Sequence, residues 1–214
     1  MGLLDRIAPR RVEPEPGAVM VPAAGEPLYP TKALRKFLTT LTSREAPVLL
    51  DLGPVVGSNV SFFGEQLGCK IFVEDIFADV DRHVRANTLE QLPAFFKRRF
   101  LQEDGTVDGI LCWDMFDYLD RPAAQELASQ LSRVLRPDGA LLGFFGTAAP
   151  RETRYTKFII MDDVNLKHRA YPALRGRQAI LLNRDIIRLF SGLRVSDSFL
   201  LQNNLREILF RKPT

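Results

Sequence analysis

Short apolar runs alternate with segments of helical periodicity along most of the chain. Four apolar runs are too short for buried helices and predict strands, at 48–52, 70–75, 109–114 and 140–145. Helical spacing of apolar side chains predicts one helix that follows an N-cap at Thr31 and others at 58–67, 92–100 and 122–136. Strands that alternate with helices indicate an α/β fold with a largely parallel central sheet.

The pattern is weakest in two places. Residues 77–107 offer, besides the helix at 92–100, only a very short candidate strand at 81–85. Residues 1–30 contain six prolines and little periodicity, which predicts an extended or partly disordered N-terminal arm. The remaining residues, 31–214, have the length of a single α/β domain.

The C-terminal third returns to β-like patterns. The runs 155–161 and 164–171 predict a hairpin. Asn183 is predicted to cap a helix with apolar residues on one side. Two further alternating runs predict the last strands, at 194–202 and 205–211.

Composition narrows the class of protein. The formal net charge is only +3, with acids and bases interspersed, so the sequence gives no argument for nucleic acid binding. Cys69 and Cys112 form neither a disulfide framework nor a metal motif, and no metal site is expected. No apolar run approaches the roughly 18 residues that a membrane span needs. A cytoplasmic protein without a membrane partner is therefore expected, while the oligomeric state stays open.

The junction after the first predicted strand carries the most specific pattern. An apolar run ends at Asp51, and Gly53 and Gly57 bracket a four-residue turn that leads into a helix. Glycines in such a turn allow unusual backbone torsions and close approach of a ligand. The pattern D-x-G-x-x-x-G resembles motif I of the class I S-adenosylmethionine-dependent methyltransferases, with Val55 in place of the family's middle glycine.

Three further segments follow in the order of that family. Glu74 and Asp75 end the second strand at the place of the acid that binds ribose hydroxyls. The segment 104–114 resembles the approach to strand 4, and 135–142 resembles the corner before strand 5. The resemblance implies a Rossmann-like sheet of seven strands in the order 3-2-1-4-5-7-6 with helices on both faces, possibly reduced around strand 3.

The resemblance also implies S-adenosylmethionine as cofactor and assigns roles to residues. The implied cofactor-binding positions are Asp51, Gly53, Pro54, Gly57, Glu74, Asp75, Trp113 and Asp114. Trp113 could stack on the adenine or on the acceptor, or it could be a core residue. Asp114 is the first candidate for a catalytic base, and Asp117 and Tyr118 on the following loop are further candidates.

Two functions remain open from the sequence. The first is a methyltransferase that acts on an unidentified acceptor, expected to be a small molecule, with 155–175 as a hairpin insertion over the pocket or a hairpin with a packing role only. The second is a methyltransferase-like domain that has lost catalysis and serves as a binding or scaffold protein. Asp51, Gly53, Gly57 and Glu74 favour the first function. Val55 and the lack of an acid after strand 3 favour the second.

Overall fold

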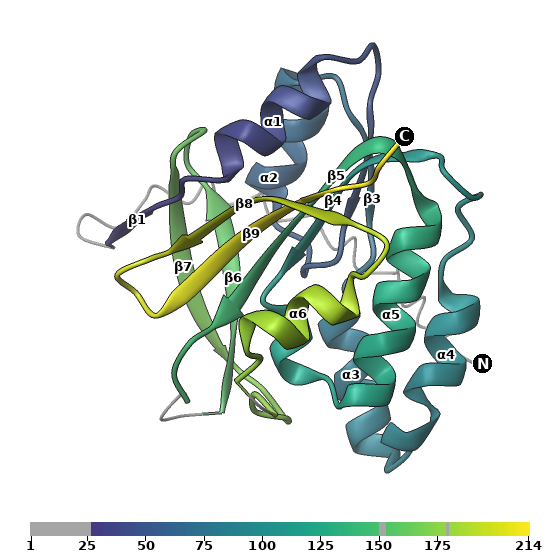
Figure 1. The fold of residues 1–214 in the computed structure, drawn as a ribbon. Helices are drawn as coiled ribbons and strands as arrows, with labels where there is room; N and C mark the ends of the chain where they lie inside the picture. The colour runs from purple at the N-terminus through teal and green to yellow at the C-terminus, as the bar shows by residue number, and fades with distance from the viewer. Residues whose placement is uncertain (1–26, 150–152, 179) are drawn as a thin grey trace, which may run out of the picture.

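The computed structural model describes residues 27–149, 153–178 and 180–214, and within them a six-stranded mixed sheet forms the centre (Figure 1). In spatial order the sheet contains β3 (Lys70–Val73), β2 (Val48–Asp51), β4 (Val107–Trp113), β5 (Leu135–Gly146), β9 (Leu205–Arg211) and β8 (Arg194–Leu200). The first four strands are parallel, whereas β9 runs antiparallel to both β5 and β8. The predicted α/β architecture is therefore confirmed.

Helices cover both faces of this sheet. One face packs against α3 (Ile76–Ala86), α4 (Leu92–Arg99), α5 (Arg121–Val134) and α6 (Asn183–Leu189), and the other against α1 (Leu34–Thr42) and α2 (Gly57–Ser61) (Figure 1). Consecutive strand residues point to opposite faces, so Leu50 and Ile110 join the first core while Leu49 and Leu111 join the second. The continuous apolar runs of the sequence thus reflect strands that are buried on both sides.

The predicted seventh strand is absent from the described residues. The candidate strand at 81–85 was wrong, because these residues lie in α3. Ile76, Phe77 and Val80 are buried at helical spacing, and Asp75 caps the helix by accepting a hydrogen bond from the Ala78 amide at 3.1 Å. From α3 the chain continues through a 3₁₀ turn (Leu89–Gln91) and α4 to β4, so β3 forms one edge of the sheet.

Two predicted helix caps were also wrong. The residue before α1 is Ala33, although the Thr31 hydroxyl does accept from the Leu34 amide at 3.3 Å. The N-cap of α6 is Leu182, which gives no side-chain cap. Helix α2 continues as a π-helical turn (Phe62–Gln66), within the bounds expected from the sequence.

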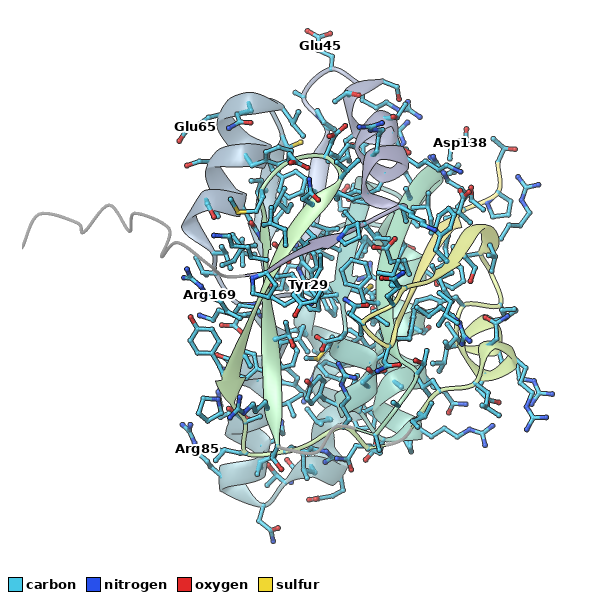
Figure 2. All side chains as sticks on the ribbon, turned by 90° about the vertical axis from the view of Figure 1, so that its left-hand side faces the viewer. Tyr29, Glu45, Glu65, Arg85, Asp138 and Arg169 are labelled. Carbon is cyan, nitrogen blue, oxygen red and sulfur yellow. The ribbon has the colours of Figure 1, made fainter. Side chains whose placement is uncertain are left out.

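A second, three-stranded sheet lies beside α2. It consists of β1 (Leu28–Pro30), β7 (Asn165–Pro172) and β6 (Arg154–Ile160), and β6 and β7 form the predicted antiparallel hairpin. Tyr29, labelled in Figure 2, lies in β1 beside β7, and its ring stacks on His168 with centroids 4.1 Å apart. Of the predicted arm, residues 1–26 lie outside the described part of the chain.

Candidate functional site

Asp51 organises the turn between β2 and α2. Its carboxylate is buried, and Oδ1 accepts hydrogen bonds from the Gly53 amide at 2.9 Å and from the Trp113 indole at 2.6 Å. Burial raises the pKa of Asp51 to about 6, although both hydrogen bonds favour the charged form. The carboxylate therefore fixes the start of the turn and is already satisfied by groups of the protein itself.

The two motif glycines serve different purposes. A Cβ on Gly53 would lie 2.7 Å from both Cδ1 and Nε1 of Trp113, so a side chain does not fit there. A Cβ on Gly57 would have no heavy atom within 4 Å. Neither glycine has a positive φ, and the turn therefore does not use the unusual torsions that the sequence suggested. Val55 is 61% exposed and also lacks a positive φ.

Trp113 ends β4 and bends back over the Gly53 turn. Its backbone is left-handed, with φ of 48°, which is rare for a bulky side chain. The indole is buried and stacks on Phe158 of the hairpin, with ring centroids 5.2 Å apart and planes 5° apart. It also contacts Phe144, at 5.7 Å. Of the alternatives open from the sequence, this arrangement makes Trp113 a core residue.

The hairpin is fastened to the same turn by Asn59. The buried side chain donates from Nδ2 to the Phe158 carbonyl at 2.8 Å and accepts at Oδ1 from the Ile160 amide at 2.9 Å. These two bonds satisfy backbone groups of β6 that would otherwise be buried without partners. The hairpin therefore holds Phe158 against the indole.

The acids at the end of β3 are also engaged. Glu74 forms an ion pair with Arg99 and accepts a hydrogen bond at Oε1 from Gln102 Nε2 at 3.1 Å. Arg99 bonds the Glu74 carbonyl as well, at 2.9 Å. Asp75 is occupied as the cap of α3. The structure thus brings Asp51, Gly53 and Trp113 together, whereas the carboxylate of Glu74 is held by α4 and the segment after it.

A second group of polar residues lies at the carboxyl ends of β4 and β5. Asp114 and Asp117 are buried, and Arg177 lies between them, with Nη2 3.0 Å from Asp114 Oδ2 and Nε 3.4 Å from Asp117 Oδ2. The Gly146 amide donates to Asp117 Oδ2 at 2.7 Å. The Tyr118 hydroxyl lies 3.5 Å from Asp114 Oδ2.

Burial is the main cause of the altered titration of this group. It raises the pKa of Asp114 to about 6, against the effect of Arg177. It raises the pKa of Asp117 to about 7, and the nearby charge of Asp114 adds to that shift. Arg177 was missed in the sequence because it lies in a loop without a motif, 60 residues after Asp117 by the numbering. No signal in the sequence connects the two.

Comparison with known proteins identifies the class of protein that carries this fold and turn. Residues 26–175 match the sequence profile of a family described as a methyltransferase domain. Because the match covers more than half of the chain, the protein belongs to this methyltransferase family. No curated protein matches the sequence.

The chain is also similar to solved structures, and the first named here supports the fold. PH0226 protein from Pyrococcus horikoshii OT3 is 18% identical with a TM-score of 0.52, and the match covers 84% of this chain and 88% of that one. A SAM-dependent methyltransferase from Aquifex aeolicus is 16% identical with a TM-score of 0.48, over 83% and 88% of the two chains. Among the described residues, no group of three potential metal ligands occurs and no helix could cross a membrane.

The residues of the turn do not fit S-adenosylmethionine as they are arranged here. The position where a Cβ of Gly53 would stand is filled by the indole of Trp113. The carboxylates of Asp51 and Glu74 already have partners within the protein. A cofactor that used these groups would require them to leave their present partners.

Proposed function

We propose that this chain is an S-adenosylmethionine-dependent methyltransferase that acts on a small-molecule acceptor and is described here with its cofactor face closed. Membership of the methyltransferase family supports this function. The observation that carries it is the Asp51–Gly53 turn, which lies where β2 ends between β3 and β4. In open α/β sheets, ligands bind outside the carboxyl ends of the strands at such a position.

The backbone of Trp113 supports a movable cover. A left-handed conformation costs a residue other than glycine about 1–2 kcal/mol, so packing and the bond to Asp51 must hold Trp113 in place. The pairing of β4 with β5 is also irregular between Leu111 and Trp113. A change of the Trp113 backbone out of the left-handed region would relieve this strain and would carry the indole away from Gly53 and Asp51.

The same contact supports a second candidate function. If the indole never leaves Gly53, the domain has no room for the cofactor on this turn and serves as a binding or scaffold protein. The partners of Glu74 favour this candidate as well, because the carboxylate would have to leave Arg99 and Gln102 before it could meet a ribose. The two candidates therefore differ in whether Trp113 moves.

Trp113 is the only tryptophan of the chain, and its fluorescence reports directly on the cover. S-adenosylhomocysteine is titrated into the ligand-free protein by calorimetry while the emission of Trp113 is followed. Micromolar binding with a red shift of the emission supports the methyltransferase. The variant Trp113→Ala, checked for folding, is expected to bind more tightly because no cover has to move.

Absence of binding would decide between the two candidate functions. No heat up to millimolar ligand, from folded wild type and from folded Trp113→Ala, would sink the methyltransferase proposal and leave the non-catalytic candidate. Binding to Trp113→Ala alone supports a retained site that the indole blocks. As a control, Asp104→Asn changes a carboxylate that is 78% exposed and precedes β4, at the opposite end of the strands from the turn, and it is expected to keep the wild-type behaviour.

A further inference from the structure

Two adjoining cavities lie beside α5 and α6, next to the group formed by Asp114, Asp117 and Arg177. The larger has a volume of about 380 Å³ and runs between α5 and α6. The smaller has a volume of about 90 Å³ and is lined by Asp117, Gly146 and Arg177. Gln178 and Ile180 line both cavities, which therefore adjoin. We call the two cavities together the groove, with the smaller one as its polar end.

The polar end carries more negative than positive charge. Two carboxylates, of Asp114 and Asp117, share the single guanidinium of Arg177. Asp114 is 0% exposed and Asp117 is 1% exposed, and Oδ1 of each has no hydrogen-bond partner among the described residues. An unpaired buried carboxylate oxygen is costly, and a donor that enters the groove would remove this cost.

The contacts of the Asp117 carboxylate involve Oδ2 and leave Oδ1 without a partner among the described residues. The Gly146 amide and Arg177 both contact Oδ2. A Cβ on Gly146 would lie 2.9 Å from Oδ2 and would enter the guanidinium, so a glycine is required there. Burial also raises the pKa of Asp117 to about 7, which is the behaviour of a carboxyl that lacks enough positive charge nearby.

The larger cavity offers apolar contacts beside charged ones. Leu119, Ala124, Leu181 and Leu189 line it together with two acids and two bases, Asp120, Asp185, Arg121 and Arg188. Its volume lies within the roughly 300–1,000 Å³ of small-molecule sites. The smaller cavity has about three times the roughly 30 Å³ that one water molecule occupies in the liquid, enough for a small charged group.

We propose that this groove binds an organic amine, with its nitrogen donating to Asp117 and its apolar part lying between α5 and α6. At the end beside Asp117 an anion fits less well, because Arg177 is already shared by two carboxylates, whereas Arg121 and Arg188 line only the larger cavity. The inference does not depend on methyl transfer, since it concerns binding in the absence of any cofactor. If the chain does transfer methyl groups, such an amine is the acceptor class to screen first.

The test uses three probes of similar shape on the full chain without cofactor. These are 2-phenylethylamine, the neutral 2-phenylethanol and the anionic 3-phenylpropanoate, with dissociation constants measured by calorimetry and by NMR titration. We expect the amine to bind at least about tenfold more tightly than the alcohol, because the ammonium donates as a cation to the carboxylate, whereas the hydroxyl donates as a neutral group. Asp117→Asn is expected to abolish this preference.

Two further variants keep the test independent of the stability of Asp117→Asn. Ile180→Trp places a larger side chain in the groove at a residue that is 45% exposed. It is expected to raise the dissociation constant of the amine by at least about tenfold. Asp104→Asn removes a carboxylate that is 78% exposed and distant from the groove, and it should change nothing. Equal binding of amine and alcohol, tighter binding of the carboxylate, or no binding at millimolar concentration would each overturn the proposal.

Discussion

Replacing Gly53 by alanine tests whether the indole of Trp113 lies on the turn in solution. The added Cβ would stand 2.7 Å from two indole atoms and 3.2 Å from Asp51 Oδ1. Neither the buried indole nor the bonded carboxylate can yield freely, so something in the core must shift. Gly57→Ala is the matched control, because the same methyl group meets nothing within 4 Å there.

The expected magnitudes follow from packing. Overpacking of this kind costs about 1–3 kcal/mol of the free energy of unfolding, and truncation of a buried tryptophan, Trp113→Ala, costs about 3–5 kcal/mol. If the indole is what the new methyl group strikes, most of the cost of Gly53→Ala disappears once the indole is gone. The double variant should then be about 1–3 kcal/mol more stable than the sum of the single effects predicts.

Urea denaturation of the wild type, the two single variants, the double variant and Gly57→Ala measures this coupling. Additive effects, within about 0.5 kcal/mol, would refute the contact. In that case Gly53 is open to ligands in solution, and the closed arrangement does not limit cofactor binding. Gly57→Ala should remain within about 0.5 kcal/mol of the wild type, as is usual away from tight contacts.

Two other predictions concern the hairpin and the buried acids. Asn59→Ala leaves a carbonyl and an amide of β6 unpaired, and it should lower the free energy of unfolding in urea by about 2–4 kcal/mol. The control Ser61→Ala removes only an exposed hydroxyl hydrogen bond and should lower it by less than about 0.5 kcal/mol. Equal effects of the two variants would contradict the role of Asn59 in holding the hairpin. The raised pKa of Asp117, about 7 against an ordinary 3.8, means that the folded state holds a proton that the unfolded state has released. The free energy of unfolding should therefore fall as the pH rises from about 4 to about 7, and Asp117→Asn should gain stability relative to wild type across that range. A difference that is independent of pH would exclude the raised pKa.

The sequence predicted the sheet well where each strand is buried on both faces. The runs 48–52, 109–114 and 140–145, which became parts of β2, β4 and β5, could be recognised because all their residues except Val48 are buried. Residues 81–85 of helix α3 were mistaken for a possible strand. The buried side of this helix contributes few apolar residues, so neither the helical period of 3.6 nor the strand period of 2 is evident in the sequence. Its true boundary depends on Asp75, whose capping bond is visible only in the fold.

The site was predictable in part. Asp51, singled out in the sequence as a cofactor-binding position, orders the turn in the structure, because a carboxylate there can reach the amide two residues later. The position of the Trp113 side chain was beyond the sequence, since its left-handed backbone is imposed by contacts with Phe158, 45 residues further on by the numbering. The same holds for Arg177, whose partners come from distant segments.

The indole over Gly53 has a consequence for how the glycine motif of this chain is read. A glycine is required at position 53 by the tryptophan of the neighbouring strand alone, because a Cβ would stand 2.7 Å from two indole atoms. The presence of this glycine is therefore no evidence by itself that the turn holds a ligand.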